Sequence, residues 1–346
     1  MTENTKLVRN TNRAVQISYT LVAVLLALIA WLHLGTLLLT ALFGYLALQI
    51  FNFRRNKALS LVLYLGAVIV VGAGLMYFAG VAYRTLPKLA QAAIPAMAEF
   101  AEKHGIELPF TDYESLKSSA VAEASEGIAT IGRYASVASL QSLLLIAGLV
   151  VALSVFVNPA WTASKGEVAE HGSLYWQVTR ELGMRFESLY RSFAKVMGAQ
   201  IKISAINTVL TAGFLLIGGY PYAALLVGLV FLCGLLPIVG NLISNTVIVG
   251  VGFTISPRAG VAALIFLVVI HKLEYFLNSK IIGQRIDSPV WLTLIGLVLG
   301  ERLMGIPGMI LAPVLLYYIK VEASAFGVSI AGDPAPEVPV PVKSAQ

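Results

Sequence analysis

The sequence predicts an all-α membrane protein with about six full transmembrane helices, two opposed re-entrant helical hairpins, and amphipathic helices outside the bilayer. Its composition is the first reason, because 58% of the residues are hydrophobic, 12% are charged and the mean hydropathy is +0.82. Soluble domains carry about 25% charged residues. The second reason is a series of apolar runs near the roughly 20 residues that a helix needs to cross a bilayer. If each hairpin is counted as one span, the total is eight.

Six full spans are predicted, at 14–32, 34–53, 58–83, 139–157, 203–217 and 260–277. Short polar or basic turns separate the first three. The first three form an N-terminal unit, 1–83. Lys6, Arg9 and Arg13 precede the first span, and "RRNK" at 54–57 follows the second. Because basic residues favour the cytoplasmic side, the N-terminus is predicted to be cytoplasmic and the first span to remain uncleaved.

Three segments are predicted to lie outside the bilayer. Residues 84–138 are mixed in charge and form an extracytoplasmic amphipathic helical segment. Residues 158–202 form a basic amphipathic helix that lies in the membrane interface, packs on a neighbouring subunit, or packs as an ordinary cytoplasmic helix. Its apolar stripe recurs at steps of three and four: Leu182, Phe186, Leu189, Phe193 and Val196. The proline-rich tail, 321–346, is predicted to be disordered.

The transport core, 203–320, contains two broken apolar runs, 222–253 and 289–319. Glycine and proline divide each run into pieces shorter than a membrane span. The predicted topology makes the first run begin and end outside, whereas the second begins at a cytoplasmic loop. Two hairpins of opposite orientation would form an inverted repeat. The alternative is that each run is a pair of short tilted helices that cross the bilayer.

Broken backbone inside a membrane is tolerated where protein buries it or where it lines a wet cavity. Two interrupted segments in corresponding halves are also the sequence pattern of a transporter site. The first hairpin tip is expected to use Pro237 as the helix stop and Gly240 as the turn residue. The second tip is expected to be shaped by the glycines and proline of "GERLMGIPG": Gly300, Gly305, Pro307 and Gly308.

Three stretches carry a family resemblance: "GGYPYAALLVGLVFLCGLLPIVGN", "LEYFLNSKIIGQRIDSPVWLTL" and "GERLMGIPGMILAPVL". Together they resemble the autoinducer-2 exporter family of bacterial membrane proteins over roughly residues 200–320. The resemblance implies a multi-pass secondary transporter of the bacterial cytoplasmic membrane that assembles as a homo-oligomer. It implies export of a small signal molecule or sodium–proton or lithium–proton exchange. The chain departs from the family pattern at Asn241 and Ser279, so no substrate is carried over.

Five polar residues are candidates for an ion or solute path through the apolar core: Glu301, Glu274, Asn241, Asn245 and Asn278. A carboxylate inside a membrane costs free energy unless it is paired or hydrated, so such residues are usually functional. Glu301 would bind a proton or a cation at the second tip, or it belongs to a solvated turn. Glu274 and Asn278 lie one helical turn apart and share a face. Glu274 is alternatively an interfacial anchor at a helix end.

The sequence carries no enzyme signature, because the zinc-protease, nucleophile-elbow and phosphate-loop motifs are absent. The single cysteine, Cys233, excludes an internal disulfide and a cysteine-based metal site. No cofactor, metal or nucleic acid is expected. The expected partners are a small molecule or an ion as substrate, membrane lipid, and further copies of the chain. A non-transporting membrane scaffold, which binds partners through its outer and basic helices, is the alternative function.

Overall fold

The computed structural model describes residues 3–52, 56–105, 131–158, 173–237, 239–282 and 289–324, with backbone alone for 3–12, 131–138, 275–282 and 290. These residues form only helices, in agreement with the predicted all-α class. The helices are α1 (Glu3–Trp31), α2 (Gly35–Phe51), α3 (Lys57–Lys103), α5 (Ile131–Val157), α6 (Leu174–Ile217), α7 (Ala223–Cys233), α8 (Val239–Ile255), α9 (Pro257–Ile282), α10 (Val290–Met304) and α11 (Ile306–Ser324). The tail beyond 324, residues 106–130 of the predicted segment 84–138, and residues 159–172 of the predicted segment 158–202 lie outside the described residues.

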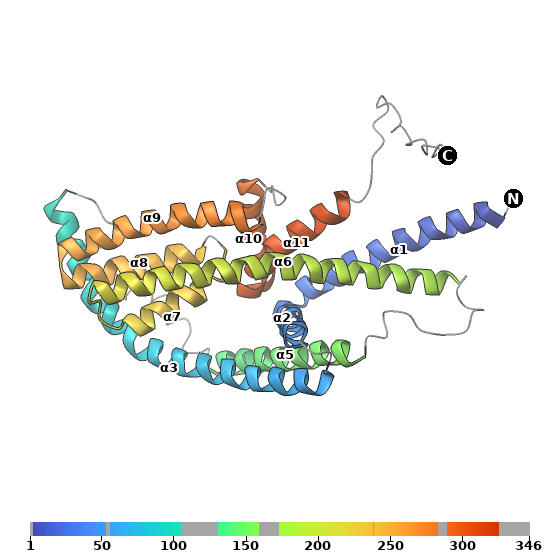
Figure 1. The fold of residues 1–346 in the computed structure, drawn as a ribbon, viewed down its shortest axis with the longest axis horizontal. Coiled ribbons are helices and arrows are strands. Elements are labelled where there is room, and N and C mark those ends of the chain that lie inside the picture. The colour runs from blue at the N-terminus through green and yellow to red at the C-terminus, as the bar shows by residue number, and fades with distance from the viewer. Residues whose placement is uncertain are drawn as a thin grey trace, which may run out of the picture.

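Helix α6 runs along much of the length of the molecule, and other helices pack along it (Figure 1). α7 and α9 pack on its C-terminal half, and α8 lies against α7, α9 and α3. α1 and α11 pack on its N-terminal half, and α10 packs on α11. α2 contacts α11 on one side, and it also packs on α5 and on the start of α3.

The predicted basic amphipathic helix and the predicted fifth span are one continuous helix in the structure. α6 begins after Ser173, whose hydroxyl accepts a hydrogen bond of 3.2 Å from the Trp176 amide. Such a cap satisfies an amide that has no partner within the helix. The apolar stripe packs on α2 and α11 of the same chain, and Phe193 is fully buried there. Intramolecular packing therefore accounts for this stripe.

Five helices in the described ranges are long and apolar enough to cross a membrane. They are Arg13–Trp31, Lys57–Lys103, Ser139–Val157, Leu174–Ile217 and Ile306–Ser324. This set differs from the six predicted full spans. α2 has 17 residues, and α9 carries Lys272 and Glu274 in its second half. α11 is longer than the predicted piece, because the helix begins at Ile306 and continues past the apolar run.

The break in the second apolar run is shorter than the sequence indicated, whereas the break in the first run lies earlier in the chain. α7 ends at Cys233 and α8 begins at Val239. α10 and α11 are separated by Gly305 alone, which has a left-handed φ of 65°. A residue with a side chain is strained in that conformation, so glycine fits this turn.

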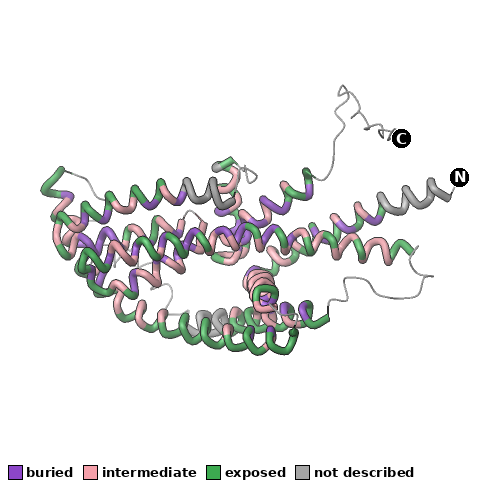
Figure 2. The backbone as a smooth tube through the Cα atoms, viewed as in Figure 1, coloured by how far each residue is buried: buried purple, intermediate pink, exposed green. Residues whose placement is uncertain are grey.

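Buried residues concentrate along α6 and its neighbours, with α7 to α9 towards one half and α11 on the other, whereas the first half of α3 is largely exposed (Figure 2). The largest cluster joins the C-terminal ends of α3 and α6 to α7, α8 and α9. A second cluster joins the middle of α6 to α2 and α11. These two clusters hold the two broken runs on opposite halves of α6.

Candidate functional site

Asn241 and Glu274, two of the predicted path residues, are in direct contact. The Asn241 Nδ2 donates a hydrogen bond to the Glu274 Oε2, and these residues lie on α8 and α9 respectively. Only 8% of the Glu274 surface is exposed. No basic side chain pairs with this carboxylate among the described residues. The structure therefore contains a buried carboxylate that is bound by a neutral amide.

Close packing of α8 against α9 sets the register of this pair. A Cβ atom on Gly252 would lie 3.0 Å from the Gly260 Cα, so the two backbones approach where both residues lack a side chain. Tyr220 donates a hydrogen bond of 2.9 Å to the Ala259 carbonyl and fixes the start of α9 beside the end of α6. From this fixed end, the helix geometry carries Glu274 down to the level of Asn241.

The break between α7 and α8 is satisfied by side chains of α6. Gln200 Nε2 donates to the Gly234 carbonyl at 2.6 Å, and Ser204 Oγ donates to the Phe231 carbonyl at 2.8 Å. These carbonyls are among those that a helix leaves without partners at its C-terminal end. The broken backbone is thus tolerated because protein groups bury and bind it.

The expected role of Gly240 as the turn residue is wrong. Gly240 lies in the first turn of α8, and Pro237 lies in the turn before it. A Cβ atom at Gly240 would lie 1.6 Å from the Cys233 carbonyl oxygen. Glycine is therefore required here because the end of α7 passes directly over the start of α8.

The second tip also depends on a close approach between two helix backbones. It is not a long loop. A Cβ atom on Gly300 would lie 2.4 Å from the Gly308 carbonyl oxygen, and one on Gly308 would lie 1.9 Å from the Gly300 carbonyl oxygen. Gly300 lies on α10, whereas Pro307 and Gly308 lie in the first turn of α11. The expectation of a break over 301–308 is therefore wrong, since Gly305 makes the turn.

Glu301 lies in the last turn of α10, where its side chain is 54% exposed. The nearest cation is Arg302, whose Nε lies 3.8 Å from the carboxylate. Both side chains are therefore exposed at the surface of the chain and not enclosed between its helices.

The two tips have different neighbours, so the structure does not bring Glu301 to the Asn241–Glu274 pair. The second tip lies against the turn between α1 and α2, where His33 Nδ1 donates to the Leu303 carbonyl at 2.5 Å. Asn245 lies one turn after Asn241 on α8 and is half-buried. Asn278 lies on α9, one turn after Glu274, and its side chain is outside the described residues.

Sequence reasoning missed a polar row on α6. Asn207 is 3% exposed, and its Oδ1 has no hydrogen-bond partner among the described residues. Gln200, Ser204 and Thr211 share its face of the helix at steps of three and four. Those steps were visible in the sequence, because a polar row inside an apolar span carries the same periodic signal as an apolar stripe.

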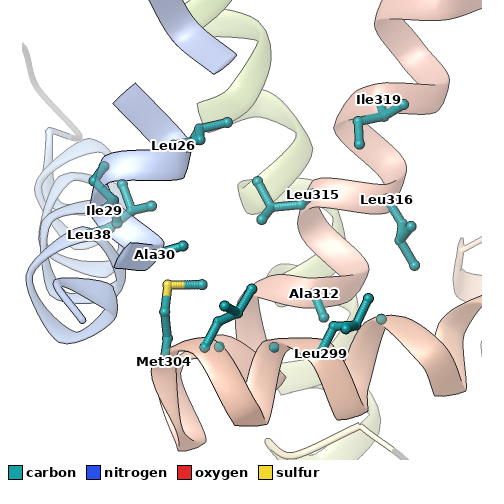
Figure 3. Close-up of a pocket in the computed structure, with 14 residues that line it drawn as sticks. Leu26, Ile29, Ala30, Leu38, Leu299, Met304, Ala312, Leu315, Leu316 and Ile319 are labelled. Carbon is teal, nitrogen blue, oxygen red and sulfur yellow. The ribbon is translucent and has the colours of Figure 1, made fainter. Parts of the chain in front are cut away.

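The cavity in Figure 3 lies away from this polar pair and has a volume of about 180 Å³. It is bounded by α1, α2, α10 and α11. All of the lining residues are apolar or glycine, including Leu26, Ile29, Leu299, Met304 and Leu315. A polar solute or an ion would find no partner there.

A second hollow of about 300 Å³ lies between α6 and α11 and is polar. Arg191 and Lys195 line it together with Glu187, and Lys195 Nζ donates to the Tyr317 hydroxyl at 2.8 Å. Within the residues that the structure describes, no three His, Cys, Asp or Glu side chains gather in a way that could hold a metal ion. The buried pair on α8 and α9 is therefore the strongest candidate for a functional site.

Comparison with known proteins gives relatives that are named for transport. The chain is 30% identical to "Putative transport protein YdbI" of Bacillus subtilis (strain 168) over 134 residues, which is 38% of each protein. It is 32% identical to "Putative transport protein YueF" of the same organism over 138 residues, 39% of this chain and 37% of that one. A 25% match to "Putative transport protein BU123" of Buchnera aphidicola subsp. Acyrthosiphon pisum (strain APS) covers 49% of this chain and 48% of the relative. The chain thus spans less than half the length of each of these relatives.

No solved structure matches the chain. A family model described as "AI-2E family transporter" matches residues 14–326. This match covers all the described helices except the first part of α1. The match extends over most of the sequence, and the chain therefore belongs to the AI-2E family of transporters.

Proposed function

We propose that this chain is a secondary transporter that moves a small polar solute or a cation across the bacterial cytoplasmic membrane by alternating access. Family membership supports the transport class. The observation that carries the proposal is the buried Glu274 carboxylate bound by Asn241, on two helices that are otherwise largely apolar. An ionisable group in such surroundings marks a proton, ion or substrate pathway more often than a structural contact.

The two broken runs would act as opposed hairpins in this mechanism. The α7–α8 hairpin is predicted to enter from outside, and Asn241 near its tip reaches Glu274. The α10–α11 hairpin is predicted to enter from inside, and its tip contacts the turn that holds His33. Both tips pack against the middle of α6, because Met304 lies in the cluster of Phe193 and Met197, and Gln200 binds the Gly234 carbonyl. This arrangement supports an inverted repeat in which the hairpins close the path alternately from either side.

An ion gradient is the energy source that suits these residues. The sequence carries no phosphate-loop motif, whereas Glu274 can gain and lose a proton. Exchange of Na⁺ or Li⁺ for a proton is the second candidate function. It is favoured by the same carboxylate, because a proton or a monovalent cation would each neutralise its charge.

Purified protein in liposomes that contain a trapped pH dye tests the proposal. A pH gradient is imposed, and Na⁺, Li⁺ or a small polar solute is then added outside. We expect the wild type to collapse the gradient with at least one of these additions, and Glu274→Gln to lose that collapse. The same assay on Glu301→Gln tests whether the second tip lies on the path. A wild-type protein that moves no proton, cation or solute would favour a membrane scaffold instead.

A further inference from the structure

The polar hollow between α6 and α11 is lined by none of the candidate path residues. Arg191 and Lys195 line it, and the hydroxyls of Ser188 and Ser192 are further donors at its wall. Lys195 Nζ donates a hydrogen bond of 2.8 Å to the hydroxyl of Tyr317 and lies 5.0 Å from the centroid of its ring. Tyr317 is buried, so it holds the lysine head beside the hollow. Cations and hydroxyl donors together are the groups that bind phosphate oxygens.

The lining of the hollow carries a net positive charge. It includes two cations, Arg191 and Lys195, and one carboxylate, Glu187. The carboxylate and Arg191 form an ion pair of 2.6 Å in which both side chains are exposed. Such a pair is weak, so a second anion can share the guanidinium, which can bind two phosphate oxygens at once. A single phosphodiester, with one negative charge, would neutralise the hollow.

The basic residues of α6 share one face of the helix. Four of them lie within about 60° of one another around its axis: Arg180, Arg191, Lys195 and Lys202. The apolar stripe that contains Phe193 lies on the other side and packs on α2 and α11. Gly198 lies on the basic face between the two lysines, and no atom lies within 4 Å of a Cβ atom added there. The described helices therefore leave this face uncovered.

The same face becomes apolar toward the C-terminal end of α6. Val209 and Leu216 are 71% and 72% exposed on it. Lys195 and Ile217, the last residue of the helix, are 22 positions apart, which is about 33 Å along the axis and close to the thickness of a bilayer core. Lys202 lies about 10 Å further along than Lys195, and its long side chain can extend back toward the headgroups. The face thus has the dimensions and polarity of a surface that contacts lipid.

The hollow lies toward the predicted cytoplasmic side. Figure 1 shows the start of α6 at the same end of the molecule as the N-terminal part of α1 and the end of α11. Arg185 of α6 binds Glu322 of α11, which also accepts a hydrogen bond from Tyr19 of α1. Because basic residues predict a cytoplasmic N-terminus, this end faces the cytoplasmic leaflet. That leaflet contains the anionic lipids that basic residues near the membrane surface attract.

An anionic phospholipid fits this surface better than two other occupants. A second copy of the chain, packed face to face, would bring the four cations of α6 toward those of its partner, and like charges at an interface cost free energy. A soluble phosphorylated molecule would use the hollow but not the exposed apolar surface that continues it. A phospholipid matches both parts, because its phosphate is anionic and its chains are apolar.

We propose that the hollow between α6 and α11 binds the phosphodiester headgroup of an anionic phospholipid of the cytoplasmic leaflet, whose acyl chains lie along the exposed face of α6. Arg191 and Lys195 bind the phosphate oxygens, and Tyr317 holds Lys195 in position. A zwitterionic phospholipid binds more weakly, because the positive charge of its own headgroup is repelled by these two cations. The bound lipid contacts both helices and stabilises their packing. This site does not depend on which solute the protein transports.

Thermal unfolding of the purified full-length protein in detergent micelles tests the site, with phosphatidylglycerol or phosphatidylcholine added at equal mole fraction. Phosphatidylglycerol should raise the Tm at a lower mole fraction than phosphatidylcholine, because it binds the folded state more tightly. Arg191→Gln and Lys195→Gln should each need about fivefold more phosphatidylglycerol for half of the rise, the ratio expected for one basic residue near the membrane surface. Glu187→Gln should need less than the wild type, because it removes the carboxylate that competes for Arg191. This gain does not depend on how well the other variants fold.

Arg258→Gln is the matched control, because it also removes one exposed cation. Arg258 lies at the start of α9, beside the opposite end of α6, where Tyr220 binds Ala259. This variant should respond to phosphatidylglycerol as the wild type does. Inorganic phosphate and glycerol phosphate supply the same headgroup chemistry without acyl chains, and neither should raise the Tm at the concentrations at which the lipid does.

Three results of this assay would overturn the site. They are equal responses of the wild type to the two lipids, responses of the three hollow variants that match the response of Arg258→Gln, and a rise with inorganic phosphate as large as that with the lipid. The last result would indicate a soluble phosphorylated ligand. Light scattering gives the mass of the protein in the micelle, and a smaller assembly of Lys195→Gln would show that the face contacts another copy of the chain instead. None of these outcomes removes the proposed transport function, which liposome uptake measures separately.

Discussion

Arg185 and Glu322 lie 137 positions apart in the chain and form an ion pair of 2.7 Å that joins α6 to α11. Their side chains are 15% and 10% exposed. Tyr19 of α1 donates a hydrogen bond of 2.6 Å to the same Glu322 oxygen, and the Arg185 guanidinium lies 4.1 Å from the Tyr19 ring centroid. A second guanidinium nitrogen binds Glu181 at 2.9 Å. One half-buried arginine therefore connects the N-terminal helix to the last helix.

Glu322→Gln should destabilise the protein by about 3 kcal/mol, the lower end of the cost of breaking a buried ion pair, because Arg185 keeps Glu181 as a partner. Unfolding of the purified protein in mixed micelles measures the difference. Glu187→Gln is the control, since its pair with Arg191 is exposed and should be worth less than about 1 kcal/mol. Equal effects of the two substitutions would contradict the structural role of Arg185.

Gly300→Ala should separate α10 from α11. Its Cβ atom would lie 2.4 Å from the Gly308 carbonyl oxygen, which is backbone and cannot rotate away. Overpacking of this kind costs roughly 1–3 kcal/mol. Gly213→Ala on α6 is the matched control, because no atom lies within 4 Å of its added Cβ. The control should be neutral or gain up to about 1 kcal/mol from higher helix propensity. The same unfolding assay compares them, and an equally stable Gly300→Ala protein would show that the two helices do not pack as described.

Sequence periodicity anticipated features that depend on neighbouring residues. The end of the fifth span at Ile217 follows from "GGYPY", and α6 ends there. The presence of two interruptions also follows from glycine and proline in the apolar runs. Their exact positions did not, because Gly240 and Gly308 serve close helix contacts and lie inside helices. A glycine in a sequence does not distinguish a turn from a helix crossing.

Features that depend on distant residues could not be read in the same way. The third span is predicted to end at residue 83, yet α3 continues through Pro87 to Lys103, and Leu89 is buried against α7, α8 and α9. The packing of that apolar face outweighs the local cost of proline. Similarly, Asn241 and Glu274 lie 33 positions apart in the chain and meet only because α8 packs on α9.

The stability of the protein should depend on the backbone preference and hydrogen bonding of the residue that replaces His33, more than on its charge. Its backbone has a left-handed φ of 53°, and its Nδ1 donates to the Leu303 carbonyl. His33→Val should lose roughly 2–3 kcal/mol, since a β-branched residue is strained in this conformation and the hydrogen bond is removed. His33→Asn should lose less than about 1 kcal/mol, because asparagine tolerates this conformation and can donate. Unfolding curves of both variants measure the two losses in stability. Similar losses would show that neither backbone strain nor the hydrogen bond matters.

A re-entrant hairpin and two crossing helices differ in the side of the membrane from which a reagent can reach the α7–α8 break. Leu236→Cys in a Cys233→Ser background gives a protein with a single thiol in the break. A membrane-impermeant maleimide, applied to oriented vesicles, should label Arg258→Cys from the outside and Arg180→Cys from the cytoplasm. Both reference side chains are exposed. A re-entrant hairpin, which enters from outside and whose break is bound by α6, predicts no cytoplasmic labelling of the Leu236→Cys protein. Labelling from the same side as Arg180→Cys would mean that α7 and α8 cross the bilayer and that Asn241 lies at its cytoplasmic face.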